Sequence, residues 1–217
     1  MRSWFSIEGS LDPLPYDGPS FFRFPDALAA VVLRQFSTEG AWVFDPFCGF
    51  GTTLVVAQRL GRQAIGFEHD PARGTFAAAR VQPPSRVIIA DVAQAGTYPL
   101  PVFDLLLTSP PYTTFRAWDD AAGRDLYRDD LVRLFGGFAS LLQPDAPLVV
   151  EVCNVRTERT GPVRLVAWEI ARALAQVYWF EGEIVRCNSG PEPAGPGYDH
   201  SYLLIFRNRR PTEAVPQ

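Results

Sequence analysis

The feature that most constrains the fold is a strand that ends in a glycine-rich turn and continues into a helix. Residues 42–53 read WVFDPFCGFGTT. The β-rich run stops at Asp45, passes Gly49 and Gly51, and leads into a helix-like segment at 53–60. This strand, loop and helix arrangement allows a nucleoside cofactor to approach the backbone closely. The segment therefore predicts an α/β fold with a cofactor at the end of its first buried strand.

The spacing of the two glycines narrows the class of cofactor. No Gly-Lys-Ser/Thr follows, so the loop is not the P-loop that cradles phosphates. A third glycine in register, which the dinucleotide-binding fingerprint needs, is also missing. A cofactor without phosphates fits better, and S-adenosylmethionine is the candidate. Taken alone, the motif could equally be a tight turn between a strand and a helix.

Two acidic residues follow the next two expected strands. The strand expected at 64–67 ends at Glu68, and that at 86–90 ends at Asp91. In a parallel sheet such carboxylates can accept hydrogen bonds from ribose hydroxyls and from the adenine amino group. Either residue alone could be a solvated acid or a helix cap. Asp70 is such a case, and we expect it to be the N-cap of a helix over 71–80.

A short proline-containing motif follows the fourth expected strand, at 104–107. Ser109, Pro110, Pro111 and Tyr112 place a hydroxyl, stiff backbone carbonyls and an aromatic ring at one point. This cluster can accept hydrogen bonds from a flat amino group while the tyrosine covers the attached ring. By itself, the tetrapeptide could also be an ordinary turn.

The remaining periodicity predicts one α/β domain with alternating strands and helices. The segment 1–20 is punctuated by proline and glycine and is expected to be an irregular arm. Further elements are expected as helices at 26–36, 126–142 and 162–175, and as strands at 147–153, 180–186 and 202–207. One strand of the last pair is expected to run antiparallel.

Together these motifs resemble those of the S-adenosylmethionine-dependent amino methyltransferases of nucleic acids, most closely the N4-cytosine DNA methyltransferase type. That family carries Asp-Pro-Phe-x-Gly-x-Gly-Thr-Thr, matched at 45–53, and an acid matched by Glu68. Its catalytic tetrapeptide is matched at 109–112. The stretch 21–26 resembles its cofactor-flanking motif, and 197–206 resembles its last strand.

The resemblance implies a Rossmann-like class I methyltransferase fold. Its sheet would be mostly parallel and seven-stranded, with helices on both faces and strand order 3-2-1-4-5-7-6. The methyltransferase domain would span 21–210, with a tail at 211–217. The implied cofactor is S-adenosylmethionine, bound by Phe24, Pro25, Asp45, Pro46, Phe47, Gly49, Gly51, Thr52, Thr53, Glu68 and Asp91.

The tetrapeptide suggests a direct methyl transfer without a metal. An exocyclic amine is a poor nucleophile because its lone pair is delocalised into the ring. If Ser109 and the Pro110 carbonyl accept its N–H groups, the nitrogen is aimed at the sulfonium methyl and pushed toward sp³ geometry. Tyr112 would stack on the target ring, and a base in a duplex would have to be flipped out. We expect Ser109, Pro110, Pro111 and Tyr112 to form the catalytic cluster.

Serine at the head of the tetrapeptide favours cytosine N4 in DNA, by resemblance alone. Adenine N6 in DNA and guanine N2 in RNA stay open as targets. A third reading is a non-catalytic S-adenosylmethionine-binding regulatory module. The resemblance also implies a place in restriction–modification.

The overall charge does not favour a nucleic-acid partner, because the net charge is −4 and the pI is near 5.2, whereas proteins that bind nucleic acids often have a basic surface. Local residues would then make the contacts, and the candidates are Phe115, Arg116, Trp118, Arg156 and Arg159. The two aromatic residues could equally pack their own loop down. No insertion is large enough for a separate target-recognition domain, so a homodimer or an accessory specificity partner is an alternative.

The sequence also predicts where the protein is located and how its cysteines are used. No apolar run approaches the roughly 20 residues that span a bilayer, and no signal pattern opens the chain, so a cytoplasmic location without membrane contact is expected. The unrelated spacings of Cys48, Cys153 and Cys187 predict neither a disulfide framework nor a metal site.

Overall fold

The computed structural model describes residues 3–7, 13–16, 23–111, 121–156, 162–188 and 200–209. Within these ranges, residues 121–126, Arg156 and Asn188 are described by their backbone alone. The main sheet consists of β1 (Trp4–Ile7), β2 (Trp42–Asp45), β3 (Gln63–Glu68), β4 (Arg86–Ile89), β5 (Leu105–Thr108), β6 (Pro147–Val152), β9 (Trp179–Asn188) and β10 (His200–Arg207). A separate two-stranded ribbon pairs β7 (Val155–Arg156) with β8 (Val163–Arg164).

The strand order of the main sheet is β1-β9-β10-β6-β5-β2-β3-β4. Neighbouring strands are parallel except where β10 pairs antiparallel with β6 and β9. The methyltransferase pattern counts β2 as its first strand. Read across the sheet from β4 to β9, the strands then follow the expected order 3-2-1-4-5-7-6, and β10 is the single antiparallel strand. The α/β class and the order of the seven strands are therefore confirmed.

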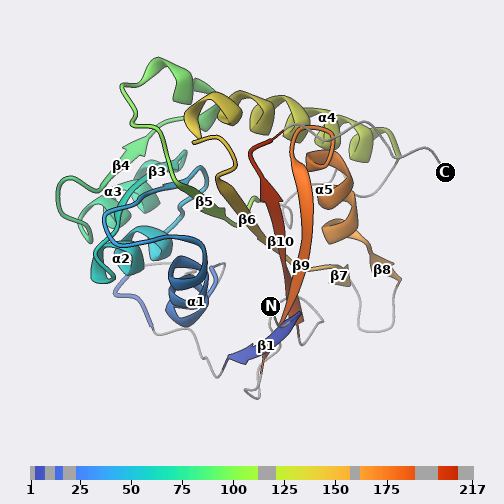
Figure 1. Ribbon diagram of the computed structural model, residues 1–217, viewed down its shortest axis with the longest axis horizontal. Coiled ribbons are helices and arrows are strands. Elements are labelled where there is room, and N and C mark those ends of the chain that lie inside the picture. Colours follow the sequence, from blue (N-terminus) through green and yellow to red (C-terminus); the bar gives the residue numbers. More distant parts are fainter. Residues whose placement is uncertain are drawn as a thin grey trace.

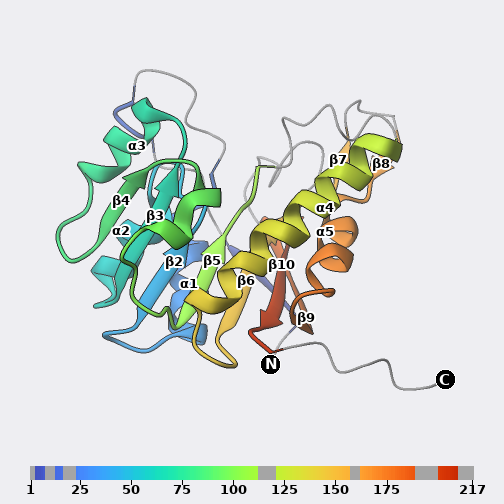
Figure 2. The same cartoon turned by 90° about the horizontal axis from the view of Figure 1, so that it is seen from above.

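Helices cover both faces of this sheet, as Figures 1 and 2 show. The helices are α1 (Asp26–Phe36), α2 (Thr52–Arg59), α3 (Pro71–Ala78), α4 (Ala121–Phe138) and α5 (Val166–Leu174), with short 3-10 helices η1 (Val92–Thr97) and η3 (Ala139–Leu141). One core cluster contains α1 and α2 side chains such as Leu33 and Leu54. The opposite cluster contains α4 and α5 side chains such as Phe135 and Ile170. The sheet is thus the middle of three layers.

The sheet has eight strands rather than the expected seven, because Trp4–Ile7 forms β1. This strand lies in the segment that the sequence predicted to be an irregular arm, and that prediction is wrong for these four residues. They pair parallel with β9, and Ile7 joins the core while Trp4 stays exposed. A four-residue edge strand that buries one side chain leaves a weak hydrophobic pattern, which explains why the sequence did not predict it.

Several helix boundaries agree with the sequence, and others shift for identifiable reasons. Helix α1 has the predicted bounds, and the Asp70 side chain caps α3 by accepting a hydrogen bond from the Arg73 amide. Helix α5 begins at Val166 instead of residue 162, because Val163–Arg164 pairs with β7. Helix α4 begins at Ala121, five residues before the predicted start, and ends at Phe138.

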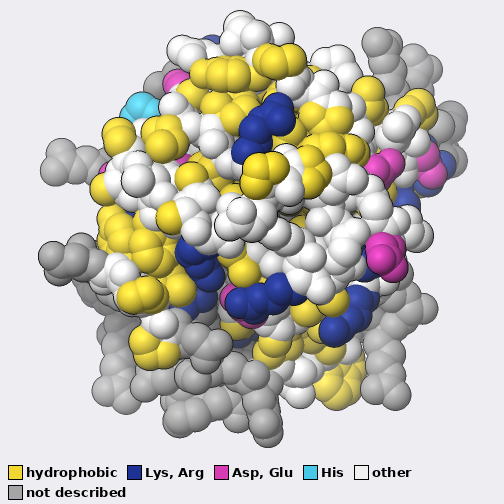
Figure 3. Space-filling view, turned by 90° about the vertical axis from the view of Figure 1, so that its left-hand side faces the viewer, with side chains coloured by type: hydrophobic (Ala, Val, Ile, Leu, Met, Phe, Trp, Pro, Cys, Tyr) yellow, Lys and Arg dark blue, Asp and Glu magenta, His cyan; other side chains and the backbone are white. Residues whose placement is uncertain are grey.

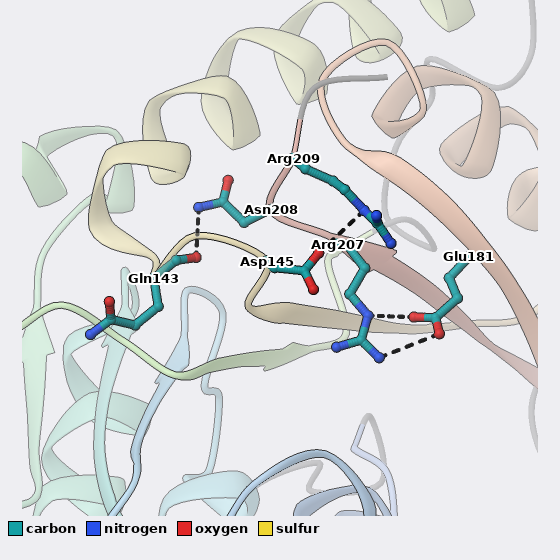
Figure 4. A network of polar contacts seen from close by, with 6 residues as sticks. All are labelled: Gln143, Asp145, Glu181, Arg207, Asn208 and Arg209. Atoms are coloured by element: carbon teal, nitrogen blue, oxygen red, sulfur yellow. Dashed lines mark hydrogen bonds and ion pairs between the residues drawn. The ribbon is translucent and has the colours of Figure 1, made fainter. Parts of the chain in front are cut away.

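A polar network ties the chain together at the amino ends of the parallel strands, where Arg207 of β10 lies opposite Pro147 of β6. The Asn208 side-chain amide donates to three backbone carbonyls around η3. Arg207 pairs with Glu181 on β9, and Arg209 pairs with Asp145 (Figure 4). These contacts hold the end of β10 against β9 and the segment around η3.

None of the helices in the described part of the chain combines the length and apolar character needed to cross a membrane.

Candidate active site at the carboxyl edge of the sheet

The glycine loop sits directly after β2 and is held against β3. The Cys48 amide donates to the Phe67 carbonyl at 2.9 Å, and the Gly51 amide donates to the Cys48 carbonyl at 2.7 Å. Gly51 has a φ of +81°, and a Cβ there would lie 3.2 Å from the Ala77 Cβ. Both the backbone conformation and the close approach of α3 thus favour glycine at this position.

Asp45 closes β2 with a buried carboxylate, only 3% exposed. Its Oδ1 accepts hydrogen bonds from the Thr108 hydroxyl at 2.7 Å and from the Phe47 amide at 3.2 Å. Burial raises the pKa of Asp45 to about 6, and the hydrogen bonds from Thr108 and Phe47 oppose that rise. The loop is therefore organised around an acid that the interior disfavours in its charged form.

The bond between Thr108 and Asp45 joins the ends of two adjacent strands. β2 and β5 are parallel neighbours, and Thr108 is the last residue of β5. Ser109 follows immediately, so the tetrapeptide and the glycine loop meet at the same edge of the sheet. The sequence placed the two motifs at neighbouring strand ends, and the structure brings them together.

The two strand-end acids also reach this edge. Glu68 is buried, and its Oε1 accepts from the Asp70 amide at 2.8 Å and from the Arg73 guanidinium at 3.0 Å. Asp91 is exposed and caps η1 by accepting a hydrogen bond from the Ala93 amide at 2.9 Å. Glu68 is thus held in a fixed position, whereas among the described residues the hydrogen bond to the Asp91 side chain comes from its own turn.

Ser109 has a partner that the sequence did not suggest. Its hydroxyl donates to Oε2 of Glu151 at 3.0 Å, and Glu151 is a buried residue of β6. Burial raises the pKa of Glu151, while the hydrogen bond from Ser109 and the Arg186 charge oppose that rise. The available signal was a single charged residue in the otherwise apolar strand PLVVEV.

The remaining predicted residues divide into those that the structure describes and those that it does not. Phe24 and Pro25 are buried at the start of α1, Pro46 and Thr52 are buried around the glycine loop, and Pro110 is buried beside exposed Pro111. Arg156 is described only by its backbone in β7. The other predicted residues lie outside the described part of the chain: Tyr112, Phe115, Arg116, Trp118 and Arg159.

One face of the molecule presents arginine side chains among hydrophobic ones. Figure 3 views the molecule from the side at which α2, α3 and β4 lie in Figure 1. Arginine side chains are scattered there among hydrophobic ones, and few acidic side chains are visible. Exposed arginines of this region include Arg59, Arg73 and Arg86.

The fold is that of the class I S-adenosylmethionine-dependent methyltransferases. A solved TehB-like SAM-dependent methyltransferase from Corynebacterium glutamicum aligns with a TM-score of 0.53 and 18% identity. The alignment covers 82% of this chain and 85% of that protein. At this level of identity the likeness concerns the fold alone.

The glycine-loop segment is similar in sequence to DNA methylases. Residues 18–77 match the N6/N4 methyltransferase family model, described as DNA methylase. The type II methyltransferase M.SmaI of Serratia marcescens is 40% identical over 67 residues, or 31% of this chain. M.MthZI of Methanothermobacter thermautotrophicus is 45% identical over 47 residues, or 22% of this chain. The expected resemblance to the N4/N6 DNA methyltransferases is therefore confirmed.

The match spans less than a quarter of each of these two relatives, 23% of M.SmaI and 13% of M.MthZI. The match to the family model contains the glycine loop and Glu68 and ends before Ser109.

Proposed function

We propose that the chain is an S-adenosylmethionine-dependent DNA methyltransferase that methylates the exocyclic N4 amine of cytosine. The observation that carries this proposal is the hydrogen bond between Thr108 and Asp45. It sets the glycine loop and the tetrapeptide side by side, as a methyl transfer between two bound molecules requires. The match of residues 18–77 to the DNA methylases supports DNA as the substrate.

S-adenosylmethionine binds in this proposal along the carboxyl ends of β2, β3 and β4. The backbone around Gly49 and Gly51 lets the cofactor approach closely. Glu68, which is already fixed by Arg73, accepts from the ribose hydroxyls, and Asp91 accepts from the adenine amino group. The further cofactor contacts are Phe24, Pro25, Asp45, Pro46, Phe47, Thr52 and Thr53.

The target amine binds at the end of β5. Ser109 Oγ and the Pro110 carbonyl accept its N–H groups and orient the nitrogen lone pair toward the sulfonium methyl. S-adenosylmethionine, when bound, would supply the methyl group to this nitrogen and would leave as a neutral thioether. Positioning of this kind can lower the barrier by several kcal/mol, up to about 7–11 kcal/mol for well-oriented groups. Tyr112 stacks on the ring of a base that has left the helix.

Adenine N6 in DNA and guanine N2 in RNA are the alternative targets, since the same geometry serves any exocyclic amine. A non-catalytic module that binds S-adenosylmethionine is the remaining alternative. The arrangement of Ser109 against an ionisable partner is unnecessary for cofactor binding alone, and this favours an enzyme.

Incubation with methyl-labelled cofactor and either DNA or RNA tests the proposal. Label in DNA, followed by mass spectrometry of the digested nucleosides, identifies N4-methylcytosine or N6-methyladenine. Label in RNA supports the RNA alternative, and tight cofactor binding without transfer to either substrate supports the regulatory module.

Two substitutions test the roles within the site. Ser109→Ala should keep cofactor affinity and lose most of the turnover, whereas Glu68→Ala should weaken cofactor binding in a calorimetric titration. Retained turnover in the first variant contradicts the role of Ser109, and unchanged affinity in the second removes Glu68 from the cofactor site.

The organisation and partners belong to the same proposal. Residues 21–210 form the methyltransferase domain, and Phe115, Arg116, Trp118, Arg156 and Arg159 contact the nucleic acid. Target selection uses either these residues or a second subunit, and sedimentation of the chain with and without DNA distinguishes the two.

A further inference from the structure

Glu151 is a charged residue in the interior of the sheet, one strand away from the proposed catalytic serine. It lies on β6 and is 7% exposed, and its Oε2 accepts the Ser109 hydroxyl at 3.0 Å. An ionised carboxylate in such a place is costly unless several groups compensate it. Its position therefore calls for an explanation beyond packing.

Compensating groups reach Glu151 from three other strands. Ser109 approaches from the end of β5, Ser201 from β10 and Arg186 from β9. Arg186 is 4% exposed and lies opposite Ser201 in the β9–β10 register. Arg186 Nε and Ser201 Oγ have no hydrogen-bond partner among the described residues. The hydrogen bond that the structure describes to the Glu151 carboxylate therefore comes from Ser109.

The direction of the hydrogen bond decides what Ser109 can offer to a substrate. A serine hydroxyl has one proton and two lone pairs. Because the proton is donated to Glu151, the lone pairs of Oγ are free to accept from an incoming amino group. An acceptor whose own proton is drawn toward a carboxylate also becomes a stronger acceptor.

We infer that Glu151 is a positioning residue that acts through Ser109, aligning the hydroxyl as an acceptor and taking up the proton that the methylated amine releases. This inference rests on the proposed function. It also accounts for the neutral serine at the head of the tetrapeptide, since the carboxylate is supplied by the neighbouring strand.

The proton balance is complete without any further reactant. After methyl transfer the amine nitrogen carries a positive charge. One N–H proton passes to Ser109 Oγ while the serine proton passes to Glu151 Oε2, which leaves a neutral methylamine and a protonated carboxyl group. Burial raises the pKa of Glu151, which makes its carboxylate a better proton acceptor, while the Arg186 charge favours the ionised form that the reaction needs.

The test is the single-turnover rate of methyl transfer to DNA by enzyme saturated with cofactor. Glu151→Gln keeps the shape and an oxygen acceptor but cannot take a proton. Its rate should fall about 100-fold, in the range typical of lost acid–base assistance, with the cofactor Kd within twofold of the wild type. The matched control is Glu183→Gln, an exposed position on β9, which should leave the rate unchanged.

The pH profile provides a readout that a purely structural role would not move. The wild-type rate should rise with pH as Glu151 ionises, with an apparent pKa above the usual range of a glutamate. This limb should vanish in Glu151→Gln but persist in the control variant Glu183→Gln. The double variant Ser109→Ala with Glu151→Gln should be no slower than Ser109→Ala alone.

The outcomes separate this inference from the proposed function. A wild-type chain that methylates neither DNA nor RNA overturns the proposed function itself. A wild type that methylates DNA, together with a Glu151→Gln variant of unchanged rate and pH profile, overturns only the role of Glu151. If Glu151→Gln does not fold, the pH profile of the residual activity of Ser109→Ala takes its place. A rate that still rises with pH in the same way in Ser109→Ala contradicts the inference, because Glu151 acts through Ser109.

Discussion

Replacing Asp45 by asparagine should make the protein more stable at neutral pH. Burial raises the pKa of Asp45 from 3.8 to about 6. A difference of this size corresponds to about 3 kcal/mol that the ionised side chain costs the folded state. Asparagine carries no charge, and its Oδ1 can still accept from Thr108 and Phe47, which both donate to Oδ1 of the aspartate. The substitution therefore removes the cost and keeps these two hydrogen bonds.

The sign of the pH dependence follows from the direction of the shift. The folded state binds the proton more tightly than the unfolded chain, so wild-type stability is lost as the pH rises from 3.8 to about 6. The asparagine variant does not lose this contribution. Its advantage should be about 3 kcal/mol at pH 8, about 1.5 kcal/mol at pH 5, and close to zero below pH 3.8.

Urea denaturation monitored by circular dichroism at several pH values measures this difference directly. Thr108→Val is the companion variant, because it removes a hydrogen bond that favours the charged carboxylate. It should cost about 1–3 kcal/mol, with the larger loss at high pH. An asparagine variant that is less stable than the wild type at pH 8, or an advantage that does not change with pH, would refute the reasoning.

Three other substitutions give sharp expectations for the free energy of unfolding, all measurable by urea titration. Gly66→Ala places a Cβ 2.6 Å from the Cβ of Cys48, inside the core, and should lower the free energy of unfolding by about 1–3 kcal/mol. An unchanged free energy would mean that the glycine loop moves aside at little cost. Gly136→Ala is the matched change in open space on α4 and should add about 0.5–1 kcal/mol, so a loss there would contradict the helix assignment. Tyr178→Phe removes a buried 2.6 Å hydrogen bond to the Phe135 carbonyl and should cost about 1 kcal/mol, whereas full stability would show that the bond adds nothing net.

The sequence predicted well those parts of the fold that local signals determine. Helix α1 and the Asp70 cap of α3 depend on neighbours within a turn or two, and both agree with the structure. The placement of Asp45, Glu68 and Ser109 at one edge also followed, because parallel strands deliver their carboxyl ends to the same side of a sheet. The roles of these residues remain predictions.

The sequence could not predict the features that depend on distant strands. Glu151 meets Ser109, 42 residues earlier in the chain, and its other partners come from β9 and β10. Strand β1 pairs with β9, at the far end of the sequence, so no local pattern marks it. Glu151 was nevertheless visible as an isolated charge in an apolar strand, and such a residue at a predicted sheet edge merits a search for a partner.

The hairpin of β9 and β10 has a consequence for how such a protein can diversify. Arg186 and Ser201 lie within its paired strands, and both ends of the connecting segment, Asn188 and His200, are at the carboxyl edge. Arg186 and Ser201 are therefore both anchored in paired strands. A change in the length or composition of the segment that joins these strands would leave Arg186 and Ser201 in register beside Glu151.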